Sequence, residues 1–442
     1  MNPPREPRLI RRGVLWLLLL GPFFFLSYGL VNTHTAGRSD VGSLVFGWEQ
    51  HMPLWPWTII PYWSIDLLYG LSFLLPRTRR EMDRHALALL TAQVISVSCF
   101  LLWPLRFTFE RPEIGGLYGG LFDVLMGFDK PYNQAPSLHI ALLVIIWAMF
   151  ARHVHRQPWR WAMHSWMALI GVSVLTTWQH HFIDVPTGAL AGFACLWLWP
   201  RQGLLPWQQA RLARDRKCWR LALYYGLGAL LCALAVFTAG GAWLWLAWPG
   251  VALLLVALNY SVFGAGGFQK DTQGRLSAAA SWLMAPYLIG AWINSRLWTW
   301  RRPQPDAVCD GVFLGRLPGR GEGGQFAAIV DLCAELPRHS AGTGPFAQQG
   351  YRALATLDLI APDSTLLHDA AAAIEQLRPQ GPLLVCCALG YSRSASAVAA
   401  WLLLTGRCPD AEQAEQRVRQ ARPGVVLHPA HRQVLQQLGA QR

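Results

Sequence analysis

Apolar stretches long enough to cross a membrane recur through the first 265 residues, with short charged breaks between them. A helix needs about 20 apolar residues to span a hydrocarbon layer about 30 Å thick. The pattern predicts eight membrane spans, at about 13–31, 56–75, 86–105, 138–151, 161–177, 184–200, 219–238 and 242–263. No small-residue cleavage site follows the first span, so we expect it to remain as an anchor.

After residue 302 the pattern changes to short strands and helices. Three strands and two helices are predicted there, at 311–315, 327–332, 383–385, 395–402 and 412–422. We therefore predict a multi-domain fold class, in which an all-α polytopic transmembrane bundle (1–265) precedes a linker (266–302) and an α/β domain (303–442).

The linker contains an apolar segment, residues 276–298, that is interrupted by Pro286, Asn294 and Arg296. A ninth membrane span here would carry the α/β domain to the outer side of the membrane. We instead expect an interfacial helix or hairpin on the cytosolic surface, because basic residues bracket the segment. These residues are Lys270, Arg275, Arg296, Arg301 and Arg302.

The composition agrees with a membrane protein, because hydrophobic residues make up 53% of the chain and charged residues only 14%. The 23 tryptophans can supply the aromatic belts found at membrane interfaces. The nine cysteines show no paired spacing typical of a metal site, so we expect neither a zinc ion nor structural disulfides.

Basic residues alternate between the two sides of the predicted bundle. The N-terminal arm and the breaks at 77–84, 152–160 and 201–220 hold 17 Lys and Arg residues, whereas the alternating breaks hold four. The positive-inside rule therefore places the N-terminus and the α/β domain in the cytoplasm. Cytosolic breaks facing anionic membrane lipids explain the net charge of +13, so no nucleic-acid partner is implied.

One stretch of the α/β domain has the layout of a loop that captures a phosphate group. Residues 387–394 read CALGYSRS and directly follow an apolar run. Five residues separate Cys387 from Arg393, which lets the loop curl around one tetrahedral anion. The loop N–H groups and the N-terminus of the next helix favour both bound phosphate and a cysteine thiolate, and Arg393 can grip two phosphate oxygens. The alternative is a buried strand and helix with an incidental cysteine and arginine.

The motif Cys387-x5-Arg393-Ser394 resembles the catalytic loop of the protein-tyrosine and dual-specificity phosphatase superfamily, and the resemblance covers roughly residues 301–442. It implies an α/β cysteine-dependent phosphatase in which Cys387 attacks phosphorus, Arg393 binds the phosphoryl group and Ser394 eases departure of the thiolate. Gly390, which the family shares, and Ser392 would help to bind the substrate. No metal or other cofactor is implied, because Arg393 and the loop amides carry the charge.

The same resemblance implies a general acid on a separate loop, because the acid must reach the ester oxygen on the side opposite the attacking sulfur. Asp358 lies 29 residues before Cys387 and fits that role, with Asp363 as the alternative. One position departs from the family, since Cys386 stands where a histidine usually precedes the nucleophile. This departure puts the rate and the pH optimum in question rather than the reaction class.

The predicted topology brings a second polar cluster to the outer face of the bundle. His139 opens the fourth span, and His180 and Asp184 lie where the fifth span meets the sixth. The 41 residues from His139 to His180 suit one helix down and one back, so both imidazoles reach the same surface. Arg106 and Arg111 leave the third span on that side. Such a set can supply a nucleophile, an acid, a carboxylate that fixes a tautomer and a cation for phosphoryl transfer.

This cluster resembles the active site of the type 2 phosphatidic acid phosphatase superfamily, particularly the branch with inositol-phosphorylceramide and sphingomyelin synthases, over about residues 55–200. The resemblance implies that His180 is the nucleophile, Asp184 its orienting group, His139 the acid and Arg111 a phosphate ligand, with Arg106 replacing a missing cation.

Three positions depart from that family. Pro104 stands in place of a lysine, Leu138 in place of a glycine, and Val174 in place of an arginine. Taken singly, a histidine at a membrane edge is more often an interfacial residue than a catalyst.

The whole layout resembles bacterial fusions of these two phosphatase types. We expect a multi-pass protein of the bacterial inner membrane that hydrolyses phosphate monoesters through a cysteinyl-phosphate. Tethering at the membrane favours a phosphorylated lipid over a phosphoprotein as the substrate. Two alternatives remain for the membrane domain, a phospholipid head-group transferase and a non-catalytic lipid-binding anchor.

Overall fold

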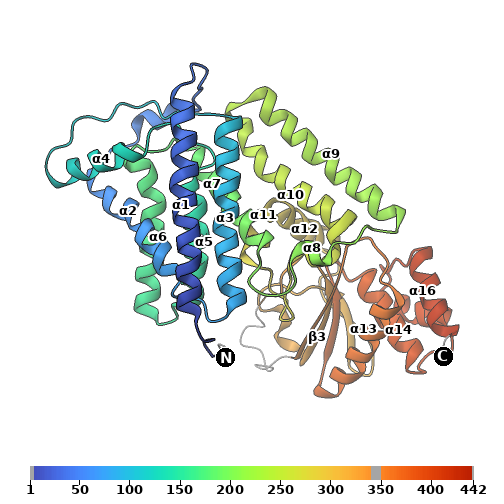
Figure 1. Ribbon diagram of the computed structural model, residues 1–442. Coiled ribbons are helices and arrows are strands. Elements are labelled where there is room, and N and C mark those ends of the chain that lie inside the picture. Colours follow the sequence, from blue (N-terminus) through green and yellow to red (C-terminus); the bar gives the residue numbers. More distant parts are fainter. Residues whose placement is uncertain (1–3, 340–349, 441–442) are drawn as a thin grey trace. The chain divides into compact units, whose positions relative to one another are not determined.

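The computed structural model describes residues 4–339 and 350–440, and Figure 1 labels those of its elements for which there is room. By its internal contacts the chain divides into two compact units, residues 1–205 and 206–442. The second unit therefore contains the helices of residues 206–302 together with the C-terminal α/β domain. The predicted functional boundaries at 265 and 302 stay predictions.

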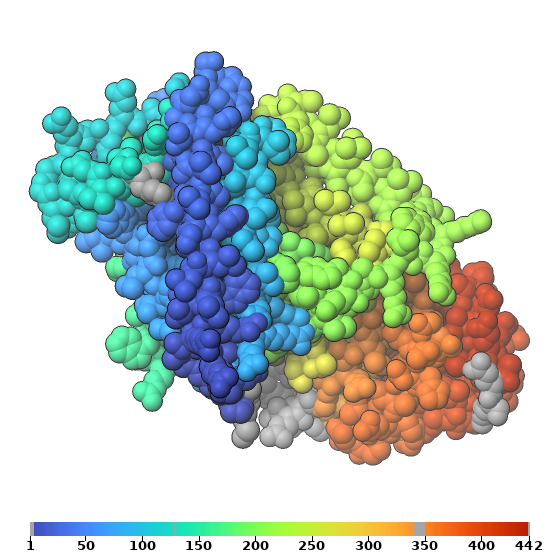
Figure 2. All heavy atoms as spheres, viewed as in Figure 1, coloured from blue at the N-terminus to red at the C-terminus, as the bar shows by residue number. Residues whose placement is uncertain are grey.

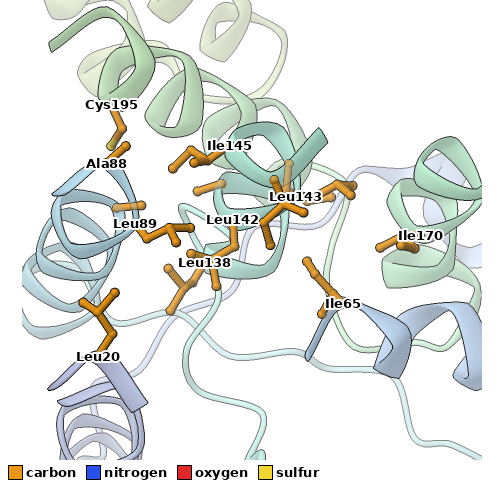
Figure 3. Packing of buried hydrophobic residues seen from close by; sticks show 14 of the residues in the cluster. Leu20, Ile65, Ala88, Leu89, Leu138, Leu142, Leu143, Ile145, Ile170 and Cys195 are labelled. Atoms are coloured by element: carbon orange, nitrogen blue, oxygen red, sulfur yellow. The ribbon is translucent and has the colours of Figure 1, made fainter. Parts of the chain in front are cut away.

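The first unit is all-helical. Its helices are α1 (Leu9–Ala36), α2 (Ile59–Ser72), α3 (Arg79–Leu102), α4 (Gly116–Phe128), α5 (Leu138–His153), α6 (Gln157–Thr176) and α7 (Asp184–Leu198). Side-chain caps fix two of the helix starts, because Thr78 accepts the Glu81 N–H and Ser137 accepts the Ile140 N–H. The core lies between the helices, where Leu89, Leu138 and Leu142 approach one another (Figure 3).

Two glycines on α7 allow this helix to lie close against α5. A Cβ atom at Gly188 would be 2.5 Å from the Ser137 carbonyl oxygen, and one at Gly192 would be 2.8 Å from the Ala141 carbonyl oxygen. Small residues four apart are a common way for membrane helices to approach closely. The close approach places the start of α5 next to the start of α7.

Within the described residues, four helical segments are long and apolar enough to cross a membrane, namely Leu9–Ala36, Arg79–Leu102, Arg216–Ala239 and Gly241–Phe268. They indicate a membrane-spanning region. The other four predicted spans coincide with α2, α5, α6 and α7, which do not meet the same criteria of length and apolarity. Figure 2 shows the side chains of α1 (blue) at the surface along the helix, and many of them are apolar, such as Leu18 and Leu26.

The second unit begins with helices and ends with an α/β domain. Its first helices are α8 (Pro206–Gln209), α9 (Arg216–Ala239), α10 (Ala247–Leu258), the π-helix η4 (Asn259–Phe263), α11 (Ala278–Leu283) and α12 (Ala285–Trp298). Helices α9 and α10 pack against each other as a hairpin. The apolar linker segment 276–298 is split between α11 and α12. With 14 residues, α12 is about 21 Å long, which is short of a bilayer core.

A mixed five-stranded sheet forms the centre of the α/β domain. The strands are β1 (Asp306–Cys309), β2 (Val312–Arg316), β3 (Ala328–Cys333), β4 (Gly350–Thr356) and β5 (Leu383–Cys387), in the order β1-β2-β5-β3-β4. β1 is antiparallel to β2, and the other neighbours are parallel. The helices α13 (Ser364–Leu377), α14 (Arg393–Leu404), α15 (Ala411–Ala421) and α16 (Pro429–Ala440) complete it. The strands predicted at 311–315, 327–332 and 383–385 are β2, β3 and β5.

The central strand β5 is buried on both faces, which explains its unbroken apolar sequence. Val385 and Cys387 belong to the core that includes α13 and α14 residues. Leu384 and Cys386 point into a second core on the other face, against which Ala291 of α12 packs. Because β5 ends at Cys387 and α14 starts at Arg393, the loop between them lies at the carboxyl edge of the sheet, where α/β proteins usually bind ligands.

Candidate active site

The loop after β5 folds back on the sulfur of Cys387. The Gly390 N–H donates to Cys387 Sγ at 3.2 Å, and the Ser394 hydroxyl donates to the same sulfur at 3.3 Å. Ser392 occupies the N-cap position of α14, so the loop ends at the positive end of a helix. Of the predicted loop residues, Gly390 and Ser394 are thus brought to the sulfur of Cys387.

Gly390 is required by the backbone of this loop. Its φ is +79°, in the left-handed region that glycine adopts without strain. A Cβ atom at this position would lie 2.3 Å from the backbone carbon of Gly315, so the loop packs directly on β2.

Arg393 is held rigidly by oxygen atoms from three segments. Its Nη1 and Nη2 donate to the two carboxylate oxygens of Glu335 at 2.9 and 2.6 Å, and Nη1 also donates to the Thr356 carbonyl oxygen at 2.8 Å. Nη2 lies 2.9 Å from Asp358 Oδ1. The guanidinium is therefore pre-aligned before any substrate arrives, and a planar fork of this kind suits phosphate oxygens.

Glu335 was not predicted from the sequence, although it is central to this arrangement. Its side chain is 2% exposed, and it lies just after β3. Burial raises the pKa of a carboxyl, but the charge and hydrogen bonds of Arg393 outweigh burial and lower the pKa of Glu335. The only sequence signal is an acidic residue two positions past the end of the buried strand β3, where a carboxylate needs a cation.

Asp358 reaches the site, whereas the alternative Asp363 does not serve it. Asp363 caps α13 by accepting the Leu366 N–H at 2.8 Å. Burial raises the pKa of Asp358 above its ordinary value. The Arg393 charge opposes this rise, and the Glu335 carboxylate adds to it. A raised pKa keeps a carboxyl protonated at higher pH, which a proton donor needs. Asp358 is thus placed and tuned as the prediction requires, and its role stays a prediction.

Cys386 points away from the site, as alternation along a strand requires. It is fully buried, pairs in register with Asp331 of β3, and is a free thiol like Cys387. Burial and the facing Asp331 carboxylate raise the pKa of the Cys386 thiol well above its ordinary value. Cys386 therefore behaves as a core residue beside the nucleophile position.

Two residues that the sequence did not single out support the loop from behind. Arg422 is fully buried, donates to Asp306 Oδ2 at 2.7 Å and stacks its guanidinium 4.7 Å from the Tyr391 ring centre. His431 Nε2 lies 2.9 Å from the Ser392 hydroxyl oxygen. These contacts tie the loop to α16 and to the residue that follows α15, and neither of them involves Arg393.

The polar residues predicted in the first unit also come together, around His180. His180 Nδ1 lies 3.1 Å from Asp184 Oδ2, and its Nε2 lies 3.2 Å from the Ser137 hydroxyl oxygen. The tight α5–α7 packing produces this contact. The neighbouring His181 is buried and paired with Glu49 at 3.1 Å, so it serves the structure. A carboxylate on Nδ1 fixes the tautomer and leaves Nε2 for chemistry.

His139 lies beside the same cavity, stacked 4.2 Å from the Tyr62 ring centre, and its Nε2 is buried with no hydrogen-bond partner among the described residues. The cavity has a volume of about 260 Å³, and its lining includes His139, His180, Asp66 and Asp129. Apolar and aromatic side chains form the rest of the wall.

Neither predicted arginine belongs to the described lining of that cavity. Arg111 donates to the carbonyl oxygens of Thr177 and Trp178 at 3.0 Å, and its guanidinium lies over the Phe122 ring. Arg106 is exposed. The role of these arginines as phosphate ligands stays a prediction. In residues 4–339 and 350–440, no group of three or more His, Cys, Asp or Glu residues could hold a metal ion.

No protein-family model matches the sequence, and no curated protein matches it. The active form of Tk-PTP is 26% identical over 32% of this chain and 99% of its own, with a TM-score of 0.29. PTPMT1 is 20% identical over 31% of this chain and 95% of its own, with a TM-score of 0.28. Human DUSP28 is 24% identical over 31% of this chain and 95% of its own, with a TM-score of 0.27.

Proposed function

We propose that the second unit hydrolyses phosphate monoesters through a cysteinyl-phosphate intermediate. The observation that carries this proposal is the convergence of five groups near the end of β5. The Cys387 sulfur receives the Gly390 N–H and the Ser394 hydroxyl, and Arg393 lies beside the Asp358 carboxyl. A nucleophile, an anion ligand and a proton donor are the parts that phosphoryl transfer to a thiolate needs.

The reaction has two steps. In the first, the Cys387 thiolate forms a bond to phosphorus while the phosphorus–oxygen ester bond breaks, and Asp358 gives its proton to the leaving oxygen. In the second, a water molecule attacks phosphorus and the phosphorus–sulfur bond breaks. The Asp358 carboxylate takes a proton from that water, and inorganic phosphate leaves. The Ser394 hydroxyl stabilises the departing thiolate. A phosphate oxygen competes with Asp358 for Arg393 Nη2, which frees the acid to turn toward the leaving oxygen.

A phosphorylated membrane lipid is the favoured substrate class. Helix α12 packs Ala291 on the sheet and exposes apolar side chains at Ile289, Trp292, Ile293 and Leu297. Such a stripe, followed by Arg301 and Arg302, suits a helix lying in a membrane interface. Holding the site at that surface raises the effective concentration of lipid phosphates. A phosphoprotein is the alternative substrate.

We infer that the phosphatase site faces the cytosol of a bacterial inner membrane and that the His180 site faces outward. The count of 17 Lys and Arg residues on one side of the predicted bundle against four on the other supports this orientation.

The test is a substrate screen with the full chain in detergent micelles. Phosphate release is measured from phosphatidic acid, phosphatidylglycerol phosphate, phosphoinositides and phosphotyrosine peptides, with Cys387→Ser as the blank. Release from at least one lipid that disappears in the blank supports the proposal. Release from peptides alone would reject the lipid class, and release that survives in the blank would reject Cys387 as the nucleophile.

A second activity is proposed for the first unit, on the observation that His180 Nε2 and His139 share a cavity while Asp184 holds His180 Nδ1. The arrangement supports phosphoryl transfer from a lipid to water or to an alcohol. Labelled phosphate released as the free ion indicates a lipid phosphatase, and label appearing on an added alcohol indicates a head-group transferase. Activity that is unchanged in the double variant His139→Ala, His180→Ala and lost with Cys387 would leave the unit as an anchor.

A further inference from the structure

The loop that carries Asp358 is attached to a helix of the apolar hairpin. Tyr260 lies in η4, directly after α10 and inside the candidate membrane segment Gly241–Phe268. Its hydroxyl donates to the backbone carbonyl oxygen of Asp358 at 3.0 Å, and the tyrosine is only 2% exposed. A buried hydroxyl without its partner costs about 1–3 kcal/mol, so this bond specifies where the loop sits.

Two further tyrosines hold Tyr260 in place. Tyr225 of α9 stacks on it at 5.6 Å between ring centres, and Tyr287 of α12 meets Tyr225 edge-on at 5.7 Å. We call Tyr225, Tyr260 and Tyr287 the tyrosine cluster. Its members come from three different helices, and two of these lie in candidate membrane segments. Aromatic pairs of this geometry favour one arrangement of the rings over others, so these contacts hold the Tyr260 hydroxyl in one position.

The loop that carries Asp358 needs a contact that holds it in place. Leu359, the residue after Asp358, has a φ of +61° and is 49% exposed. A left-handed backbone costs a residue with a side chain roughly 1–2 kcal/mol, and an exposed leucine recovers little of this by packing. The contacts of Asp358 itself must therefore hold the turn. These contacts are the Tyr260 hydroxyl on its carbonyl oxygen, Arg393 on its carboxylate and a backbone hydrogen bond from Leu359.

Substrate phosphate competes with Asp358 for Arg393, but it does not compete for the Tyr260 hydroxyl. When a phosphate oxygen takes Arg393 Nη2, the Tyr260 bond still ties Asp358 to a helix outside its own loop, beside the local backbone hydrogen bond from Leu359. We infer that Tyr260 is a positioning residue for the proton donor, through which the membrane hairpin supports the chemical step. The inference rests on the proposed function, because it assigns the proton to Asp358.

A positioning role has a signature that a general structural role lacks. Proton donation matters for a poor leaving group and hardly at all for a good one. Loss of the hydroxyl in Tyr260→Phe should therefore lower kcat/KM on the order of tenfold for phenyl phosphate, whose leaving phenol has a pKa of about 10. For a dinitrophenyl phosphate, whose leaving phenolate is stable, the change should be under about twofold.

The experiment uses the full chain in micelles and a series of substituted phenyl phosphates. The readout is the slope of log kcat/KM against the pKa of the leaving phenol, for wild type, Tyr260→Phe, Asp358→Asn and the control Tyr224→Phe. Tyr224 is 60% exposed on the same helix as Tyr225, so the control makes the same change outside the cluster. We expect a steep slope for Asp358→Asn, an intermediate slope for Tyr260→Phe and the wild-type slope for Tyr224→Phe.

A uniform loss across the series in Tyr260→Phe, or no loss, would overturn the inference. The double variant Tyr260→Phe, Asp358→Asn adds a second test, because a residue that acts through Asp358 has no further effect once the carboxyl is gone. An added loss in the double variant would also overturn it. Failure of the proposed function looks different, since Cys387→Ser would then keep its activity or Asp358→Asn would keep the wild-type slope.

Discussion

Glu335 and Arg393 form a bidentate ion pair, with Nη–Oε distances of 2.6 and 2.9 Å and side chains 2% and 1% exposed. The pair fixes the plane of the guanidinium at the edge of the loop after β5. Because the Glu335 carboxylate accepts hydrogen bonds from Nη1 and Nη2, the Arg393 guanidinium keeps its position when no substrate is bound. A phosphate can bind without first ordering this side chain, which lowers the entropic cost of binding.

Glu335→Gln should weaken both the site and the fold. The amide keeps one hydrogen bond to Arg393 but removes the charge that balances the guanidinium. We expect kcat/KM to fall on the order of tenfold or more and the free energy of unfolding to fall by roughly 3 kcal/mol. Phosphate release and the unfolding midpoint in micelles measure the two effects. The control is Glu375→Gln, a 40% exposed carboxylate paired with Arg378, for which both values should stay near wild type because the amide oxygen can still accept the Trp401 indole N–H.

The pH dependence of activity should report Asp358. The acid must be protonated to donate, and its raised pKa keeps it protonated to higher pH than an ordinary aspartate. Activity on phenyl phosphate should therefore be present below the pKa of Asp358 and be lost as the pH rises through it. Asp358→Asn should lower the rate at acidic pH and remove this alkaline fall. An unchanged alkaline fall in Asp358→Asn would assign the proton to another group.

Lys270 should stabilise the second unit through Asp331. Its ammonium donates to Asp331 Oδ2 and to the Cys333 carbonyl oxygen, each at 2.6 Å, and both charged side chains are buried. Burial lowers the pKa of a lysine, but the Asp331 carboxylate outweighs burial and raises the pKa of Lys270. Lys270→Met leaves a buried carboxylate unpaired and should reduce the free energy of unfolding by roughly 3–5 kcal/mol. Arg275→Met, an exposed neighbour in sequence, should leave the unfolding midpoint unchanged.

Gly390→Ala should inactivate the phosphatase site. The backbone conformation alone costs alanine about 1–2 kcal/mol, and its Cβ would also collide with β2. Gly321→Ala is the matched control, because Gly321 has the same φ of +79° but open space around the added atom. Activity and the unfolding midpoint separate the two variants. Equal effects in both would mean that the contact with Gly315 is unimportant.

The local part of the candidate site could be predicted because it is contiguous in sequence. Cys387, Gly390 and Arg393 lie within one strand–loop–helix unit, whose geometry follows from the spacing. Glu335 could not be predicted, because its partner Arg393 is 58 residues away. An acidic residue that follows a buried strand and faces solvent would show the same sequence pattern as one that pairs with a buried arginine.

The helices were predictable from hydropathy, while their partners were not. The segments at 219–238 and 242–263 were expected to be membrane spans, and they lie in α9 and in the candidate segment Gly241–Phe268. Nothing in their apolar pattern indicates that Tyr260 bonds to a loop 98 residues away. A tyrosine near the end of a span is usually explained as a belt residue, and only the folded chain reveals its acceptor.

The most direct test of the central claim is to trap the covalent intermediate. The full chain is mixed with a ³²P-labelled aryl phosphate, quenched in acid within milliseconds and digested, and the labelled peptide is identified by mass spectrometry. The account predicts label on Cys387, retained longer when Asp358 is replaced by Asn and absent in Cys387→Ser. Label on His180 alone, or no labelled protein during turnover, would contradict it.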